Sequence, residues 1–481
     1  MPVDELLTGL DSDQLAAVTA AETLIAVVAA AGSGKTTVVT RRIAHRIATE
    51  QADEQHVLAV TFTRQAAGEL RRRLIGLGLR GELTVGTFHS VAYGLLRRRW
   101  ADQSRSAPSL LTNRLGYLRD VLGPDPSRID VHALAAELEW MRAQALSPDQ
   151  YAVLASERGR RPPIPPARVA DLLSAFDTLK RKRGVVDFDD LLMQCADELR
   201  RDRDFAAATR WRFRHLVVDE FQDINPAQFA LLELIRGDRA DLCVVGDPRQ
   251  AIYGWNGADP TLLDHVEQTY PGVRVVRLRS NYRCTPAVVT AAAEVLSTAG
   301  RTDDSRAVRA DGPAVELLGA ADEIAEAAAI ARRVRDLRPA GGRWRSIAVL
   351  ARTNHQLGPI ASALADVGIP AVLGPRGRET DEAERRLLLA EARGLSDPDA
   401  LRTWATDLAA GLGGDAPSAL HRELAGSLRR FLAASPTGMG RSFAEWHAVD
   451  AGSQAPADGV ELLTFHAAKG REWRAVIVAG I

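Results

Sequence analysis

Residues 29–37 read Ala-Ala-Ala-Gly-Ser-Gly-Lys-Thr-Thr, a glycine-rich turn that ends in one lysine and two threonines. The apolar run from Leu24 to Val28 predicts a buried strand before the turn, and residues 35–47 predict a helix after it. In that setting backbone N–H groups surround phosphates, Lys35 neutralises the β- and γ-phosphates, and Thr36 offers a hydroxyl to Mg²⁺. The stretch therefore predicts a nucleoside triphosphate site in an α/β fold.

The lysine of this turn stands out in a chain that uses arginine almost everywhere else. The chain has only four lysines, Lys35, Lys180, Lys182 and Lys469, among 61 lysines and arginines. A lysine kept at position 35 therefore favours a specific chemical role over general charge. The alternative is a glycine-rich turn after a core strand, because Ala29 occupies the place of the first glycine in the general phosphate-loop pattern.

Two adjacent carboxylates end a second apolar run. Residues 215–218 predict a strand, and Asp219 and Glu220 follow it directly. Because ligands bind at the carboxyl ends of strands in α/β sheets, we expect Asp219 to hold Mg²⁺ and Glu220 to orient and deprotonate the attacking water. For this pair taken alone, a helix cap or a solvated surface pair is the alternative.

Two further segments carry groups suited to a γ-phosphate. Gln250 follows the predicted strand 242–245, and its neutral amide can contact the γ-phosphate and lose that contact on hydrolysis. Arg283 offers a rigid, permanently charged donor fork to the same phosphate, and Tyr282 can stack on an adenine face. A surface strand end is the alternative for residues 281–283. The expected catalytic set is Lys35, Asp219, Glu220, Gln250 and Arg283.

Nine segments resemble, in order, the motifs of the UvrD/Rep/PcrA-type superfamily 1 DNA helicases, and the resemblance extends over nearly the whole chain. They are residues 10–14, 61–67, 86–90, 187–192, 219–223, 245–255, 281–283, 351–354 and 464–473. One such motif is a weak signal, whereas nine in the family's order are not coincidental. The resemblance implies two RecA-like P-loop NTPase domains, an α/β architecture.

The resemblance also assigns binding roles. It implies that Gln14 reads the adenine, that Glu472 contacts the ribose and that His466 lies towards DNA, although a structural hydrogen-bond partner is the alternative for His466. The expected nucleotide contacts are Gln14, Ala31, Gly32, Ser33, Gly34, Lys35, Thr36, Thr37, Tyr282, Arg283, Gly470 and Glu472, with Thr36 and Asp219 as metal ligands. The expected DNA contacts are Phe62, Thr63, Arg64, Thr87, His89, Tyr253, Trp255, Arg352, Asn354 and His466.

The aromatic residues of these segments suit single-stranded DNA, which proteins bind without sequence preference by stacking bases on flat side chains. Aromatic residues make up only 5% of the chain, yet Phe62, Phe88, Tyr253 and Trp255 all fall within the motifs. Tyr253 and Trp255 are two positions apart, so an extended backbone would project both to one face. A place in the core is the alternative, for Phe88 above all.

The composition is that of an ordinary multidomain protein of 481 residues, with 46% hydrophobic and 26% charged residues. Because the net charge is −1, a DNA path requires a local stripe rather than bulk charge. Candidates are Arg64, residues 71–73 and residues 97–99, with solvated helix faces as the alternative. Few cysteines without metal spacing (Cys195, Cys243 and Cys284), no signal peptide and no membrane-length apolar run predict a cytoplasmic protein.

The order of predicted strands and helices divides the chain into four parts. Residues 1–100 and 184–272 predict the first, ATP-binding RecA-like domain, and the mainly helical residues 101–183 predict an inserted subdomain. Residues 273–375 and 458–481 predict the second RecA-like domain, with strands at 273–276, 315–318, 347–350, 462–465 and 475–478. Residues 376–457 predict an accessory insertion that is reduced relative to the family.

Two departures from the family concern DNA contact and turnover. Asn256 stands where relatives usually carry an arginine, which weakens one expected DNA contact. The sequence stops at Ile481, directly after the ribose-contacting motif, so the family's final motif and its γ-phosphate arginine are missing. We therefore expect a fragment that binds ATP and single-stranded DNA, turns ATP over poorly and does not unwind duplex DNA.

The residues and the resemblance together imply an ATP- and Mg²⁺-dependent helicase or translocase that acts on single-stranded DNA and on junctions of single and double strands. The resemblance implies 3′ to 5′ movement and a role in DNA repair or recombination, with repair or nuclease proteins as candidate partners. Two alternatives stay open. One is the motor subunit of a helicase–nuclease complex, and the other is a nucleotide-gated DNA-binding module with little turnover.

Overall fold

A six-stranded sheet forms the centre of the first of two compact units, Met1–Val315 and Glu316–Ile481. The computed structural model describes residues 2–111, 114–123, 129–254, 257–374, 388–410, 419–443 and 458–481. The strands follow the order β3 (Thr84–Gly86), β2 (Val57–Val60), β6 (His215–Val218), β7 (Leu242–Gly246), β1 (Leu24–Ala29) and β8 (Arg274–Leu278). Every neighbouring pair is parallel, which confirms the expected α/β class.

The central strand β1 shows why an unbroken apolar run folds as a strand in this sheet. Ile25, Val27 and Ala29 belong to one hydrophobic cluster, and Ala26 belongs to the cluster on the opposite face. Alternate residues of a strand point to opposite faces, so a strand that is covered on both faces needs an apolar residue at every position. β1 is such a strand, because it pairs with β7 on one side and with β8 on the other.

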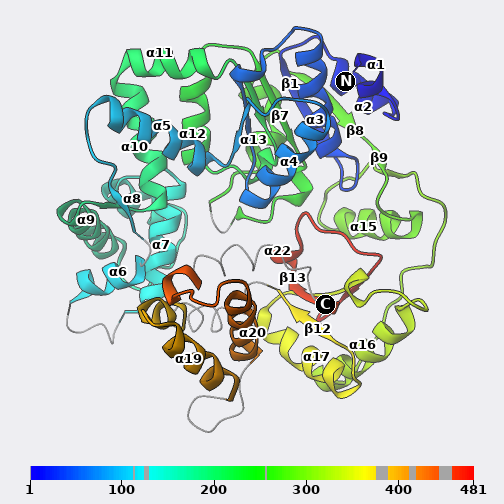
Figure 1. Cartoon of the computed structure of the whole chain (residues 1–481). Helices are drawn as coiled ribbons and strands as arrows, with labels where there is room; N and C mark the ends of the chain where they lie inside the picture. The colour runs from blue at the N-terminus through cyan, green and yellow to red at the C-terminus, as the bar shows by residue number, and fades with distance from the viewer. Residues whose placement is uncertain are drawn as a thin grey trace. The chain divides into compact units, whose positions relative to one another are not determined.

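Helices cover both faces of this sheet (Figure 1). One face carries α2 (Ser12–Thr19), α3 (Lys35–Ala48) and α4 (Arg64–Gly76), and the other carries α5 (Phe88–Asp102), α10 (Phe188–Arg201) and α12 (Pro226–Arg236). The first unit also contains α1 (Val3–Leu7), η1 (Glu54–His56), α11 (Arg203–Arg212), η3 (Phe221–Asp223), η4 (Pro248–Gln250), α13 (Thr261–Asp264), α14 (Val266–Thr269) and α15 (Pro286–Thr298). A short parallel pair, β9 (Ser280–Asn281) and β10 (Arg306–Ala307), follows β8.

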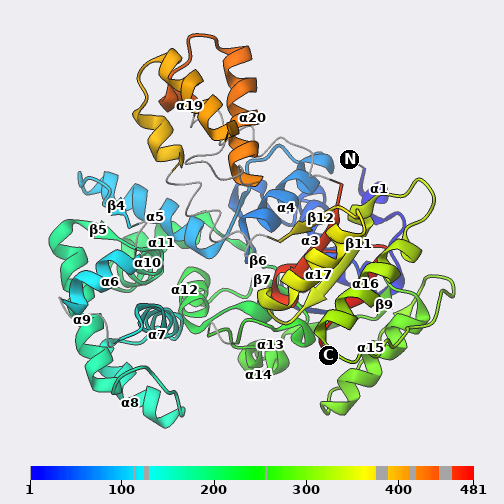
Figure 2. The same cartoon turned by 90° about the horizontal axis from the view of Figure 1, so that it is seen from below.

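Four helices between α5 and α10 form a group with its own core, which we call the helical insertion (Figure 2). They are α6 (Arg114–Leu122), α7 (Val131–Ala143), α8 (Pro148–Glu157) and α9 (Pro166–Arg183). Tyr151 and Phe176 are fully buried within it. Gly184 ends α9 in a left-handed conformation, the usual way for a helix to stop at glycine. β4 (Ser109–Leu110) and β5 (Val185–Val186) pair where the chain enters and leaves this group.

The second unit contains a four-stranded parallel sheet in the order β12 (Ala371–Leu373), β13 (Val460–Thr464), β11 (Ile347–Ala351) and β14 (Ala475–Val478). Its core includes residues of α16 (Glu323–Leu337) and α17 (Asn354–Asp366), while η6 (Trp344–Ser346) precedes β11 and α22 (Phe465–Ala468) follows β13. Two further helices, α19 (Pro398–Ala410) and α20 (Ala419–Ala434), pack around a separate cluster that includes Trp404 and Leu428.

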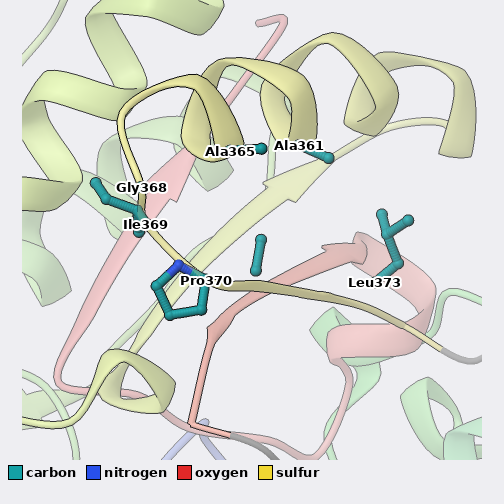
Figure 3. A pocket seen from close by; sticks show the side chains of 7 residues that line it. Ala361, Ala365, Gly368, Ile369, Pro370 and Leu373 are labelled. Carbon is teal, nitrogen blue, oxygen red and sulfur yellow. The ribbon is translucent and has the colours of Figure 1, made fainter. Parts of the chain in front are cut away.

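A pocket of about 430 Å³ opens in the second unit between α17 and β12 (Figure 3). It is lined by Ala361, Ala365, Gly368, Ile369, Pro370, Ala371 and Leu373. None of these side chains offers a polar group, whereas ligand sites normally combine apolar walls with a few polar groups that fix orientation. We therefore assign the pocket no chemical role.

Two strands expected in the second domain are corrected by the structure. Residues 273–276 fall largely in β8, which pairs with β1 in the first sheet and does not open the second. Residues 315–318 form no strand, and Leu317 is 86% exposed. An apolar run shows that a segment can become a strand, but it carries no information on which strand will pair with it.

The described ranges hold no helix that is both long and apolar enough to cross a membrane. The longest of the described helices, α9, has 18 residues and carries four basic side chains in its last turn.

Candidate nucleotide site and DNA-contact elements

The phosphate loop joins β1 to α3. Gly32 and Gly34 have φ values of 68° and 81°, a left-handed conformation that glycine adopts without strain. A Cβ atom at Gly32 would lie 2.5 Å from the Cβ of Arg283, so the close approach of that segment also requires glycine. Ser33 Oγ donates to the carbonyl oxygen of Ala30 at 2.7 Å and fixes the turn from inside.

The first turn of α3 is open to an anion. Gly34 is the N-cap and has no side chain that could accept from the first N–H groups of the helix. These N–H groups and the helix dipole favour a phosphate at this end. Lys35, Thr36 and Thr37 begin the helix, and its first turn contains no acidic residue. The geometry therefore suits the phosphate site expected from the sequence.

Gln14 is tied to the loop by its side chain. It forms a capping box with Asp11 at the start of α2, in which its backbone N–H donates to Asp11 Oδ1 at 2.8 Å. Its Nε2 donates to the carbonyl oxygen of Ser33 at 2.9 Å, and the residue is buried. Gln14 therefore braces the phosphate loop, and its role in reading adenine stays a prediction.

Residues 281–283 contact the same loop. The backbone N–H of Tyr282 donates to the carbonyl oxygen of Gly32 at 2.9 Å, and its hydroxyl donates to Asp11 Oδ2 at 2.5 Å. Burial and this bond to Asp11 raise the pKa of the Tyr282 hydroxyl. The buried Asn281 accepts the N–H of Arg283 through Oδ1 at 2.9 Å. Asn281 thereby holds Arg283 beside the glycine of the loop.

The two carboxylates follow β6, whose neighbours in the sheet are β2 and β7. Removal from water and the charge of Glu220 raise the pKa of Asp219 to about 7, against the opposing charge of Lys35. Glu220 has φ 55° and ψ 44°, a left-handed conformation that costs a non-glycine residue about 1–3 kcal/mol. The end of β6 therefore carries an excess of negative charge on a strained turn.

The expected metal ligands are one hydroxyl, of Thr36, and one carboxylate, of Asp219. Among the residues that the structure describes, no group of three or more His, Cys, Asp and Glu side chains could hold a metal ion. Mg²⁺ commonly takes only one or two carboxylates from the protein and completes its octahedron with phosphate oxygens and water. The hydroxyl, the carboxylate and the local excess of negative charge fit that mode of binding.

A chain of hydrogen bonds links Glu220 to Gln250 across the ends of β6 and β7. Gln222 Nε2 donates to Glu220 Oε2 at 2.5 Å, and Gln222 Oε1 accepts the N–H of Asp247 at 2.9 Å. Asp247 Oδ2 in turn accepts from Gln250 Nε2 at 2.7 Å. Gln222 and Asp247 are both fully buried. The expected base and the expected γ-phosphate sensor are therefore the two half-buried ends of one network whose middle is buried.

Two of the residues expected at DNA stack on each other. The rings of Phe62 and Tyr253 have centroids 4.7 Å apart and planes 24° apart. Thr63 and Thr87 are the N-caps of α4 and α5, so their hydroxyls also have a structural use. The side chain of Arg64 and the whole of Trp255 and Asn256 lie outside the described residues.

Three arginines of the two runs expected as a DNA stripe form ion pairs within the protein. Arg72 and Arg73 both form ion pairs with Glu69 on α4. Arg99 forms ion pairs with Glu198 and with Asp202. Phe88 is 5% exposed and belongs to the core of the first unit. These contacts favour the alternatives given above, which are helix faces for the arginine runs and a place in the core for Phe88.

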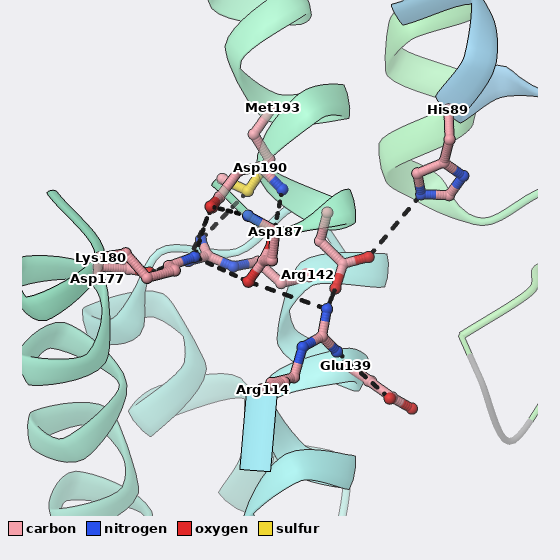
Figure 4. A network of polar contacts seen from close by, with 10 residues as sticks. His89, Arg114, Glu139, Arg142, Asp177, Lys180, Asp187, Asp190 and Met193 are labelled. Carbon is pink, nitrogen blue, oxygen red and sulfur yellow. Dashed lines mark hydrogen bonds and ion pairs between the residues drawn. The ribbon is translucent and has the colours of Figure 1, made fainter. Parts of the chain in front are cut away.

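His89 lies at one end of a network of charges that ties α5 to the helical insertion (Figure 4). Its Nε2 lies 4.0 Å from Asp189 Oδ1, and Asp189 Oδ2 accepts from Arg114 of α6 at 2.6 Å. Although burial opposes it, contact with His89 and Arg114 lowers the pKa of Asp189. Asp189 therefore joins one residue expected at DNA to the first helix of the insertion.

Lys180 of α9 is the centre of this network. It is 2% exposed and donates to Asp187 Oδ2 at 2.8 Å and to Asp190 Oδ2 at 2.6 Å. Arg142 of α7 pairs with Asp177 and donates to Met193 Sδ at 3.2 Å. We call the whole set the insertion network: Arg114, Arg142, Lys180, Glu139, Asp177, Asp187, Asp189 and Asp190.

The remaining expected residues lie in the second unit, in the segments that follow β11 and β13. Arg352 follows β11, and Asn354 begins α17. His466 lies on α22, directly after β13. Gly470, with φ 78°, and Glu472 come between α22 and β14. Their contributions to the nucleotide and DNA sites stay predictions.

Three buried or half-buried side chains that hold the site together had no role in the expectation from sequence. Asp11 could have been found, because Asp-x-x-Gln before a helical pattern is a capping-box signal. Gln222 and Asn281 lie inside the motifs, but nothing in a single sequence shows that a neutral amide will face inward. Their importance becomes visible only through their partners Glu220 and Arg283.

Comparison with known proteins agrees with this geometry. The UvrD/REP helicase N-terminal domain matches residues 10–271, and the UvrD-like helicase C-terminal domain matches residues 276–376. The chain is 35% identical to the ATP-dependent DNA helicase UvrD2 of Mycobacterium tuberculosis, over 99% of this chain and 73% of that protein. It is 31% identical to the ATP-dependent DNA helicase PcrA of Bacillus subtilis, over 82% of this chain and 54% of that protein. It is 32% identical to DNA helicase II of Escherichia coli, over 77% and 52%. The chain belongs to the UvrD/REP helicase family.

Proposed function

We propose that this chain is an ATP- and Mg²⁺-dependent DNA helicase that moves 3′ to 5′ on single-stranded DNA and acts at junctions of single and double strands in DNA repair or recombination. Membership of the family and the names of the relatives support the ATP-dependent helicase activity. The observation that carries the proposal is the chain of hydrogen bonds that runs from Glu220 through the buried Gln222 and Asp247 to Gln250.

Binding of ATP uses the loop, the start of α3 and the segment 281–283. The N–H groups of α3 and the ammonium of Lys35 take up the phosphate charge. Arg283 is held beside the loop, so its guanidinium can reach the terminal phosphate. When bound, Mg²⁺ neutralises charge on the β- and γ-phosphates, and Thr36 and Asp219 are the residues that would hold it.

Hydrolysis depends on Glu220 as the base that orients and deprotonates water. Gln222 fixes the Glu220 carboxylate through a bond of 2.5 Å, and it is itself fixed by Asp247. Gln250 shares Asp247 with Gln222, so a change at the γ-phosphate contact of Gln250 alters the same network that holds the base. This is a direct route from the state of the nucleotide to the state of the catalytic carboxylate.

For DNA we propose a platform that includes the stacked pair of Phe62 and Tyr253. A flat aromatic pair accepts bases of any sequence by stacking, as a motor that moves along DNA requires. We further propose two RecA-like domains: residues 1–100 with 184–315, which include β8 of the first sheet, and residues 316–375 with 458–481. The helical insertion lies within residues 101–183, and we assign residues 376–457 to the reduced accessory insertion.

The test is ATP-driven strand displacement from duplexes that carry a single-stranded tail at either the 3′ or the 5′ end. The helicase family predicts displacement of the 3′-tailed duplex, with Lys35→Ala as the inactive control. Binding of ATP and DNA without displacement would instead agree with the expectation from the sequence that residues 1–481 do not unwind duplex DNA. Displacement of the 5′-tailed duplex alone would show that the chain moves 5′ to 3′, opposite to the proposal. DNA-stimulated hydrolysis without displacement would indicate a translocase. ATP-dependent DNA binding without hydrolysis would show that the chain is a nucleotide-gated DNA-binding module and not a motor.

A further inference from the structure

The end of α11 presents an exposed tryptophan among arginines. Trp211 is 65% exposed, although burial of a tryptophan is strongly favourable. Arg210 and Arg212 flank it in sequence, and Arg214 follows just before β6. These residues lie where β6 begins, at the opposite end of the strand from the catalytic carboxylates. They are therefore separate from the nucleotide site.

The tryptophan ring is held in place by its neighbours and not by a hydrophobic core. The ring of His56 meets it edge-on, with centroids 4.6 Å apart and planes 77° apart. His56 is itself anchored by Nδ1, which lies 3.0 Å from the carbonyl oxygen of Arg212. The guanidinium carbon of Arg214 lies 5.9 Å from the centre of the Trp211 ring. A flat aromatic ring is thus largely exposed beside positive charge.

A fourth arginine joins this group from the loop before β7. Arg239 Nη1 donates to the carbonyl oxygen of Phe213 at 3.4 Å. Its guanidinium therefore lies at the backbone of the residue that separates Arg212 from Arg214. Burial, Arg210 and Arg214 lower the pKa of Arg239, in that order. We call Trp211, Arg210, Arg212, Arg214 and Arg239 the Trp211 patch.

Few direct ion pairs balance the positive charge of the Trp211 patch within the described part of the chain, although Asp241 lies near enough to favour the charged form of Arg239. There, no carboxylate lies within 4.0 Å of Arg210, Arg212 or Arg239, and Arg214 has only Asp53 at 3.9 Å. Arg46, by contrast, has a direct carboxylate partner, because it donates two hydrogen bonds of 2.8 Å to Asp241. Like charges held close together without partners destabilise a protein unless an anion binds them.

We propose that the Trp211 patch is a second contact site for single-stranded DNA, in addition to the DNA path of the proposed function. A base stacks on the exposed face of Trp211, and the arginines bind the phosphates on either side of it. An acidic peptide would satisfy the arginines but has no need of an exposed flat ring. A nucleotide strand uses both features of the patch, so it is the occupant that the chemistry favours.

The experiment measures binding of fluorescein-labelled oligothymidylates by anisotropy, using the whole 481-residue chain. Oligonucleotides of about 8 and about 30 nucleotides are compared, because one binding fold covers roughly 4–16 nucleotides. We expect Trp211→Ala to weaken binding of the long oligonucleotide about 5-fold or more and to leave the short one unchanged. Trp211→Phe keeps a flat ring, and it should retain most of the affinity.

The arginines give a second, independent readout. We expect the double variant Arg212→Gln and Arg239→Gln to reduce the slope of log affinity against log salt concentration by about 1.4 for the long oligonucleotide, since each phosphate contact to single strands contributes roughly 0.7. Arg200→Gln is the matched control, because Arg200 is an exposed arginine on α10 that is already paired with Asp197. It should change neither affinity nor slope.

Unchanged affinity and salt slope in both patch variants would overturn the proposal. It would also be overturned if the variants lost binding of a glutamate-rich peptide while oligonucleotide binding stayed the same, since the patch would then be a protein-binding surface. If Trp211→Ala unfolds, photocrosslinking of the unaltered protein to iodouracil oligonucleotides decides the question. A crosslink in the peptide that contains Trp211 supports the site, and crosslinks only elsewhere refute it.

Discussion

Two clusters of carboxylates in the first unit have opposite electrostatic designs. At the end of β6, burial and the charge of Glu220 outweigh the opposing charge of Lys35, and the pKa of Asp219 rises to about 7. In the insertion network, Lys180 alone lies within 3.3 Å of three carboxylates, and two arginines add further charge. The first cluster leaves negative charge for a ligand to neutralise, whereas the second neutralises it internally. Chemistry is therefore expected at the first and stability from the second.

The largest expected effect tests the first half of this contrast. Glu220→Gln removes the base and one negative charge, so we expect ATP hydrolysis to fall by about 10²- to 10⁴-fold while ATP binding persists. The free energy of unfolding should not decrease, because the charge on Asp219 loses a repulsive neighbour. Steady-state hydrolysis and nucleotide titration check this, with Lys35→Ala as the control that loses ATP binding. Normal hydrolysis by Glu220→Gln would remove Glu220 from the catalytic set.

The next effect tests the second half. Lys180→Met leaves buried carboxylates without their central cation, so we expect the free energy of unfolding to fall by about 3–5 kcal/mol. Urea denaturation followed by circular dichroism measures it. Lys182→Met, two positions away on the exposed side of α9, is the matched control and should change stability by less than about 0.5 kcal/mol. Equal effects of the two substitutions would show that the insertion network is not a source of stability.

Gln222 is where catalytic and structural roles meet. Gln222→Ala removes the bond to Glu220 and leaves the N–H of Asp247 without its acceptor. We expect a loss of about 1–3 kcal/mol in the free energy of unfolding, together with a lower rate of ATP hydrolysis at saturating ATP. Denaturation and hydrolysis are measured on the same sample. A loss of stability with an unchanged rate of hydrolysis would show that Gln222 has a structural role only.

The smallest expected effect concerns Asp189. Asp189→Asn keeps the shape but loses the charge that faces Arg114, so we expect a loss of about 1 kcal/mol near pH 7. Because the pKa of Asp189 is lowered in the folded protein, its contribution is complete above the unfolded value of about 4 and disappears as pH falls through the folded value. Unfolding of both proteins across this pH range should show the two stabilities converging in acid. A difference that stays constant would assign the effect to packing.

The sequence predicted the elements whose signal is local. The phosphate loop lies between β1 and α3 because an apolar run, two glycines and a helical pattern occur within about a dozen residues. The α/β class and the family were also confirmed, because each motif is recognised from residues that are close together in the sequence. Neither prediction required any knowledge of which distant segments meet.

Predictions that depended on distant pairing were the ones that failed. Residues 273–276 were recognised as a strand, but they pair with β1 and not with the second sheet. Residues 315–318 have the composition of a strand and form none. The roles of Gln222 and Asn281 are not predictable from the sequence, because they come from partners that one sequence does not reveal. Side-chain partners and sheet membership are long-range properties, whereas helix caps and loops are local ones.

The contact between the phosphate loop and residues 281–283 has a consequence for synthesis of the protein. Tyr282 and Asp11 are separated by 271 residues, and β1 completes its pairing only with β7 and β8. A ribosome that has made the loop must therefore still add most of the first unit before the loop acquires its final supports. Until then β1 has two unpaired edges, a state in which chaperones or premature association compete with folding. The nucleotide site is encoded near the start of the chain, yet it can be finished only late in translation.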